Sequence, residues 1–134
     1  MSDATARTAQ EDLDGGAANV QCVVFELDGV NVEAMAGETL WDVARRVGTD
    51  IPHLCHRPQP GYRPDGNCRA CMVEINGERV LAASCKRMPA VGMVVHSQSE
   101  RAVKARAMVM ELLVADQPAR ETSHDPTSAL WNWA

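Results

Sequence analysis

The sequence contains no run of 18 consecutive apolar residues and no basic-then-apolar segment at its start. A membrane-spanning helix needs about 20 apolar residues, and a secretory signal needs an apolar core behind a basic start. We therefore expect neither a membrane span nor a secretory signal. The net charge of −5 also argues against a nucleic-acid-binding face, which would be basic.

The chain has five cysteines, an odd number that does not suit a fully paired disulfide framework. Metal-bound thiols in a reducing compartment explain such a number better, so we expect a cytoplasmic protein. With 134 residues the chain is long enough for one domain. A domain with so small a core is more stable when a metal centre crosslinks its loops.

Four of the cysteines lie close together, in the spacing C-x12-C-x2-C-x13-C. Structural zinc sites usually show two C-x2-C pairs, whereas this chain has one pair, a long Gly/Pro-containing loop before it and a remote fourth cysteine. That asymmetry suits a larger group and resembles the plant-type [2Fe-2S] pattern, with a longer first gap. We predict a [2Fe-2S] cluster, with a four-thiolate zinc site as the alternative. The predicted ligands are Cys55, Cys68, Cys71 and Cys85.

The residues around these cysteines suit a negatively charged cluster. Such a cluster needs backbone N–H donors and nearby positive charge, and Gly61 and Gly66 allow the main chain to approach closely. Basic side chains also crowd the ligands in sequence; they are His56, Arg57, Arg63, Arg69, Lys86 and Arg87. We expect this loop to hold the cluster and to tune it, although its charges could equally form a solvated face.

Two histidines flank the first predicted ligand, which raises the question of a Rieske-type site, where two His replace two Cys. Because four well-spaced cysteines are present, His53 and His56 are not needed as ligands. We expect them to donate hydrogen bonds near the cluster or to lie in solvent. Cys22 lies in an earlier predicted strand, and we expect it to be a packed thiol.

Alternating apolar residues predict two hairpins and a further strand. The first hairpin turns at Asp28-Gly29, the second covers residues 71–82 and turns at Asn76-Gly77, and the last strand covers residues 93–97. A capping box formed by Thr39 and Asp42 predicts a helix over residues 40–47, with Trp41 on its partly buried flank.

A second helix is predicted before Pro118, beginning with a capping box of Ser97 and Glu100 and ending near Asp116. Its last two turns are apolar on nearly every side, which indicates burial on every side. We therefore expect a neighbouring domain or subunit to pack there. Trp131 and Trp133 near the end of the sequence are residues of the kind that anchor interfaces.

These elements predict an α+β fold: a β-grasp, ferredoxin-like domain followed by a C-terminal helix. We divide the chain into a mobile leader (1–19), the [2Fe-2S] domain (20–97), a helix packing on a neighbouring domain or subunit (98–117) and a linker or tail (118–134).

The cluster stretch, from Cys55-His-Arg-Pro to Cys68-Arg-Ala-Cys71 and on to Leu81-Ala-Ala-Ser-Cys85, resembles the N-terminal [2Fe-2S] domain of several oxidoreductases. They include the respiratory complex I large subunit, NAD-linked hydrogenase diaphorases and iron-only hydrogenases. Together with the segment at 105–118, it resembles in particular the alpha subunit of NAD-dependent molybdenum or tungsten formate dehydrogenases.

The resemblance implies one-electron transfer as the front end of a multi-cluster oxidoreductase, with a flavin- or NAD-linked subunit as partner. No cysteine follows Cys85, and no molybdopterin-binding or catalytic segment is visible, so we expect no catalytic residue in this chain itself. Two alternatives remain from the residues alone. One is a free-standing ferredoxin that shuttles electrons between enzymes, and the other is a zinc-stabilised interaction domain.

Overall fold

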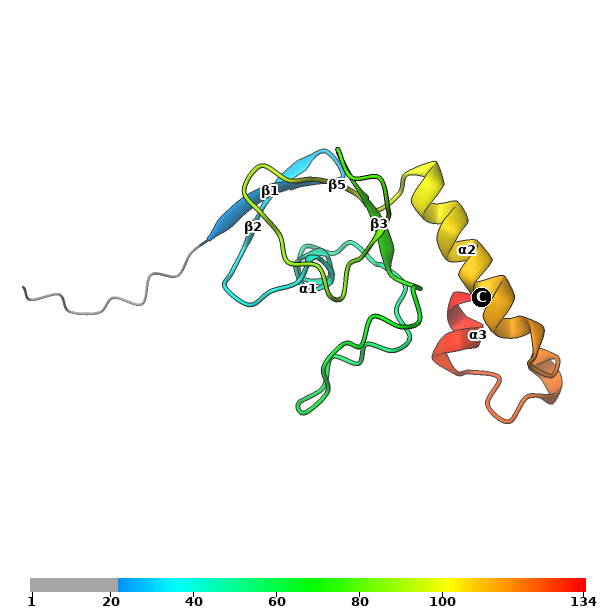
Figure 1. Ribbon diagram of the computed structural model, residues 1–134. Helices are drawn as coiled ribbons and strands as arrows, with labels where there is room; N and C mark the ends of the chain where they lie inside the picture. Colours follow the sequence, from blue (N-terminus) through cyan, green and yellow to red (C-terminus); the bar gives the residue numbers. More distant parts are fainter. Residues whose placement is uncertain (1–21) are drawn as a thin grey trace, which may run out of the picture.

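The computed structural model describes residues 22–134 and contains a five-stranded sheet with helices beside it (Figure 1). The expected leader, residues 1–19, lies outside the described residues. The elements, in chain order, are β1 (Val23–Leu27), β2 (Val30–Ala34), α1 (Leu40–Arg46), β3 (Met72–Ile75), β4 (Ala82–Ala83), β5 (Val94–His96), α2 (Glu100–Ala115), the 3₁₀ helix η1 (Arg120–Thr122) and α3 (Ala129–Trp133).

The sheet has the strand order β2-β1-β5-β3-β4, and only the β1–β5 pairing is parallel. The first hairpin is confirmed: β1 and β2 pair from Val23 with Ala34 to Leu27 with Val30. Asp28 and Gly29 both have positive φ, 50° and 84°, which is the conformation of a tight two-residue hairpin turn. The mixed sheet with its few helices confirms the α+β class expected from the sequence.

Helix α1 lies within the curve of the sheet and closes its core (Figure 1). The predicted capping box is present: the Asp42 N–H donates to the Thr39 hydroxyl, and the Thr39 N–H donates to the Asp42 carboxylate. The core between helix and sheet includes Phe25, Leu40, Val43, Val73 and Val95, all at most 1% exposed. Trp41 is only 3% exposed, so the expectation of a partly buried flank was wrong.

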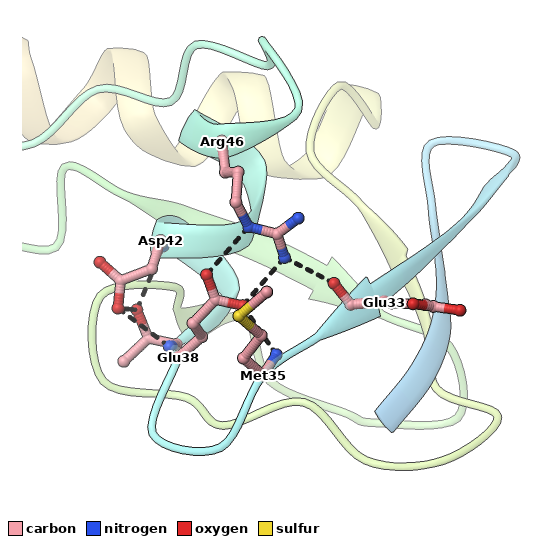
Figure 2. Close-up of polar contacts among 6 residues, drawn as sticks. Glu33, Met35, Glu38, Asp42 and Arg46 are labelled. Atoms are coloured by element: carbon pink, nitrogen blue, oxygen red, sulfur yellow. Dashed lines mark hydrogen bonds and ion pairs between the residues drawn. The ribbon is translucent and has the colours of Figure 1, made fainter. Parts of the chain in front are cut away.

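The connection between β2 and α1 is held by one side chain (Figure 2). Arg46, in the last turn of α1, donates two hydrogen bonds to the Glu38 carboxylate, at 3.0 and 2.9 Å, and a third to the carbonyl of Glu33, at 2.6 Å. Glu38 also accepts from the N–H of Met35, at 2.8 Å. The turn between strand and helix is thereby fixed at both ends.

The second hairpin differs from its prediction in length. A turn does form at Asn76-Gly77, because the N–H of Glu78 bonds the carbonyl of Ile75. The chain rejoins the sheet only at Ala82, which pairs with Val73. On its other edge β3 pairs with β5, where Ile75 lies opposite Val95.

The beginning of α2 was also predicted wrongly. Its N-cap is Ser99, whose hydroxyl accepts from the N–H of Ala102, and not Ser97. Ser97 is fully buried and bonds Asp28 of the first hairpin, so a tertiary contact takes the place of the expected cap.

Helices α2 and α3 lie together at one side of the sheet (Figure 1). Ala102, Arg106 and Met110 form the buried stripe of α2, while Val103, Met108 and Leu112 remain at least 42% exposed in the chain. Among the described residues, no helix is long and apolar enough to cross a membrane.

Candidate metal centre

The four predicted ligand residues lie in two settings. Cys55 and Cys68 are half-buried at the two ends of a loop that projects from the body of the domain (Figure 1). Cys71 immediately precedes β3 and Cys85 follows β4, and both are at most 1% exposed. The site therefore has one edge near the surface and one edge set against the core.

The thiols of Cys71 and Cys85 interact directly. A hydrogen bond from Cys85 stabilises the Cys71 thiolate and, despite burial, lowers the pKa of Cys71 to about 6. The same bond raises the pKa of Cys85, together with burial and with the negative charges of Cys71, Cys55 and Cys68. The charges of the other three predicted ligands thus all act on Cys85.

The surface pair is held by backbone donors. The N–H groups of Cys55 and Ala70 point at the Sγ of Cys68, at 3.4 and 3.5 Å. Burial raises the pKa of the Cys55 thiol, but hydrogen bonds from Cys68 and from the backbone of Asn67 and Gly66 outweigh it, so this pKa lies below its ordinary value. Thiolate is the form that binds metals, and this loop stabilises it.

The segment carrying Cys85 is fixed by the first turn of α1. The N–H groups of Leu40 and Trp41 have no partner within the helix, and they donate to the carbonyls of Arg87 (2.9 Å) and Ser84 (3.0 Å). The Ser84 hydroxyl in turn donates to the carbonyl of Cys71, at 2.6 Å. One residue thereby couples helix α1 to both core-side cysteines.

The histidines beside Cys55 pack around Trp41. The ring centroids of His53 and His56 lie 4.6 and 4.5 Å from that of Trp41, both edge-on. His56 is 7% exposed, and neither of its ring nitrogens has a hydrogen-bond partner. His53 lies 3.4 Å from the carbonyl of Ile51 and faces Trp133 of α3, with 6.0 Å between ring centroids. His56 therefore neither donates a hydrogen bond near the cluster nor lies in solvent, so the expectation was wrong for this residue.

The basic residues of the cluster loop are exposed. Arg57, Arg63 and Arg69 all reach solvent, and Arg69 adopts φ = 60°, which places it in the left-handed region. Lys86 packs against Gly66, where a Cβ atom would lie 2.9 Å from Cγ of the lysine. A hollow of about 340 Å³ opens beside the loop; its lining residues are Asp65, Gly66, Arg69, Ala82, Ala83, Lys86 and Arg87.

Arg106 is a residue near the site that the sequence reasoning missed. It lies on the buried face of α2, is 7% exposed, and donates to the carbonyl of Met72, the residue after Cys71. Its signal in the sequence was a charged residue four positions after Ala102 and four before Met110, in the middle of an apolar stripe.

The fifth cysteine, Cys22, lies outside the group of four predicted ligands. Cys22 is exposed, so the expectation of a packed thiol was wrong. Within residues 22–134, no three His, Cys, Asp or Glu side chains are arranged to hold a metal ion.

Comparison with known proteins identifies the kind of site. Residues 20–100 match the family described as the 2Fe-2S iron-sulfur cluster binding domain. The chain belongs to this family. A [2Fe-2S] cluster is therefore its cofactor, which favours the first of the two predictions over the zinc site.

Several larger proteins contain a similar segment. One NADH-quinone oxidoreductase subunit of Rickettsia prowazekii is 36% identical over 92 residues, and the corresponding subunit of Mycobacterium tuberculosis is 36% identical over 113 residues. These matches cover 69% and 83% of this chain but only 13% and 14% of the relatives. The NADP-reducing hydrogenase subunit HndD of Solidesulfovibrio fructosivorans is 37% identical over 99 residues, 72% of this chain and 17% of the relative.

The fold has a solved counterpart. A chain in the crystal structure of an NAD+-reducing [NiFe]-hydrogenase in its H2-reduced state superposes with a TM-score of 0.63 and 35% identity, covering 72% of this chain and 40% of the other. The present chain thus corresponds to a minor part of each of these proteins.

The donor set fits a [2Fe-2S] cluster in its chemistry, although no three of the described His, Cys, Asp or Glu side chains are arranged to hold a single metal ion. Four thiols are available, two of them held by backbone N–H groups, and Gly66 leaves room where a side chain would collide with Lys86. This ferredoxin-like domain is an electron-transfer domain, because a bound [2Fe-2S] cluster accepts and returns one electron.

Proposed function

We propose that Cys55, Cys68, Cys71 and Cys85 are the cluster ligands, and that the domain passes single electrons within a multi-cluster, NAD-linked oxidoreductase. The observation that carries the ligand assignment is the pairing of the four cysteines in space. The N–H of Cys55 lies 3.4 Å from the Sγ of Cys68, and the N–H of Ser84, beside Cys85, donates to the carbonyl of Cys71 at 3.3 Å. The fifth cysteine, Cys22, is exposed and precedes the sheet's first strand.

The partner proposal rests on the kind of protein in which similar segments occur. Each relative named above belongs to an NADH-quinone oxidoreductase or to a nicotinamide-linked hydrogenase. A flavin- or NAD-linked subunit is therefore the proposed electron partner. The apolar residues left exposed on α2, among them Met108 and Leu112, support a neighbouring domain or subunit at that helix.

Within this class we propose that the complete enzyme is a formate dehydrogenase. The support is the resemblance of the cluster loop and of the segment at 105–118 to the alpha subunit of those enzymes. The relatives named above belong to NADH-quinone oxidoreductases and hydrogenases, and the electron source distinguishes these enzymes from a formate dehydrogenase.

Electron paramagnetic resonance of the dithionite-reduced protein, purified without oxygen, tests the cluster and its role. We expect the signal of a one-electron-reduced two-iron cluster, with equal amounts of iron and acid-labile sulfide. Zinc in place of iron, without that signal, would overturn the electron-transfer proposal.

A second experiment tests the proposed enzyme. The native oxidoreductase that contains this chain is mixed anaerobically with formate, NADH or hydrogen, and the same signal is followed. Reduction by both formate and NADH supports the formate dehydrogenase proposal. Reduction by hydrogen and NADH but not by formate contradicts it in favour of a hydrogenase, and reduction only by an added soluble reductase indicates a free shuttle.

A further inference from the structure

Arg106 is a buried cation that links three parts of the fold next to Cys71. Its Nη1 donates to the carbonyl of Met72 at 2.9 Å and to the carbonyl of Ser97 at 2.6 Å. Ser97 donates from its backbone N–H and its hydroxyl to the Asp28 carboxylate, at 2.7 and 2.5 Å. A continuous polar chain therefore runs from the turn of the first hairpin, through α2, to the peptide after a proposed ligand.

The positive charge of Arg106 lies between two negatively charged groups, Asp28 and Cys71. Burial lowers the pKa of the Arg106 guanidinium, and the negative charges of Asp28 and Cys71 oppose that effect. A guanidinium remains protonated in proteins, so Arg106 keeps its charge. The cation thus lies within electrostatic reach of a core-side thiolate on one side and of the Asp28 carboxylate on the other.

We propose that Arg106 is a positioning residue for the cluster and that its buried charge raises the cluster's reduction potential. Reduction adds one negative charge at the cysteine site, and a nearby cation stabilises the reduced state more than the oxidised state. The effect is larger for a buried cation than for the exposed arginines of the cluster loop, because solvent screens the exposed charges. The bond to the Met72 carbonyl also fixes the backbone that presents Cys71.

The inference rests on the proposed ligation by Cys71 but goes beyond it, since α2 lies after the last cysteine of the sequence. It gives α2 a role in setting the reduction potential, in addition to its packing against β3.

Arg101 provides a matched control. It lies on the same helix and carries the same charge, but its guanidinium is exposed and contacts the carbonyl of Arg79 and, at 3.7 Å, the carboxylate of Glu74. Replacing it removes one positive charge from α2 without touching the peptide after Cys71.

The experiment is a redox titration of the cluster-loaded full chain, monitored by electron paramagnetic resonance, for wild type, Arg106→Gln, Arg106→Lys and Arg101→Gln. We expect a lower midpoint potential for Arg106→Gln, a smaller change for Arg106→Lys, which keeps the charge, and little change for Arg101→Gln. A purely structural role would lower the melting temperature of both Arg106 variants and leave the midpoint potential in place. That result, or equal shifts in Arg106→Lys and Arg106→Gln, would overturn the proposal.

Asp28→Asn keeps the test decisive if Arg106→Gln does not fold. Asparagine tolerates the positive φ of this turn position and can still accept a hydrogen bond from Ser97. Removing the carboxylate leaves the charge of Arg106 uncompensated, so the midpoint potential should rise. An unchanged or lower potential contradicts the inference. Failure of the ligand assignment would look different, because the wild-type protein would then lack the two-iron signal altogether.

Discussion

The indole Nε1 of Trp41 donates a 3.1 Å hydrogen bond to the carbonyl of Ile51. Both residues are at most 3% exposed, and Ile51 begins the short segment that leads to Cys55. The backbone N–H of the same tryptophan bonds Ser84, the residue before Cys85. Trp41, a single buried residue of α1, therefore links the segment that leads to Cys55 with the segment that leads to Cys85.

Replacing Trp41 by phenylalanine should destabilise the protein and loosen the entry to the cluster loop. The variant keeps an aromatic ring but leaves the buried carbonyl of Ile51 without its donor, which costs about 1–3 kcal/mol. We expect a lower melting temperature and faster bleaching of the cluster's visible absorbance. Trp131→Phe, on half-buried α3, is the control. Equal bleaching rates in the two variants would contradict the anchoring role.

Cys68→Ser should abolish or strongly weaken cluster assembly. Its sulfur accepts two backbone N–H groups and is one of four proposed ligands, so serine removes a soft thiolate that the cluster needs. Cys22→Ser removes an exposed cysteine outside the site and should leave iron and sulfide content unchanged. The measurement is iron and acid-labile sulfide per chain. Full iron in Cys68→Ser, or loss of iron in Cys22→Ser, would falsify the ligand set.

Gly66→Ala should weaken the loop more than Gly61→Ala does. Both glycines have positive φ, 72° and 86°, so alanine costs about 1–2 kcal/mol of backbone strain at either position. Only at Gly66 would the new Cβ also meet Lys86, at 2.9 Å, whereas nothing lies within 4 Å at Gly61. Cluster yield and thermal stability of the two variants give the comparison. Similar losses in both would show that the contact with Lys86 is easily relieved.

Glu38→Gln should lower stability at neutral pH and much less in acid. Hydrogen bonds from Arg46 hold the pKa of Glu38 below its ordinary value, with a further contribution from the Met35 N–H. The carboxylate therefore stabilises the fold above the unfolded-state pKa of about 4.3, and this contribution disappears as the pH falls through the lower native pKa. Urea unfolding midpoints of wild type and variant should converge in that range.

Glu33→Gln is the control for that experiment, because Glu33 accepts the hydrogen bond from Arg46 at its backbone carbonyl and not at its side chain (Figure 2). Its midpoint should follow the wild type at each pH. A constant difference between wild type and Glu38→Gln across the pH range would contradict the proposed pairing.

Local signals predicted most of the elements that position the site. The Asp28-Gly29 turn, the capping box of Thr39 and Asp42, and the last strand before α2 all formed where they were expected. Each depends on residues within a few positions of one another, and such interactions can be read directly from a sequence. One local signal gave the wrong result. Ser97 has an equally good capping pattern, but it donates its hydrogen bond to Asp28, 69 positions earlier in the sequence, and caps no helix.

The sequence by itself predicted the chemistry of this protein, because the spacing of four cysteines around a Gly/Pro-containing loop favours a two-iron cluster over a single zinc ion, and the family match confirms that cofactor. Only the tertiary structure decided what surrounds them. The burial of Trp41 and the placement of Arg106 against the peptide after Cys71 depend on how helices pack onto the sheet. Packing brings together residues distant in sequence, and no local pattern specifies which polar groups will meet there.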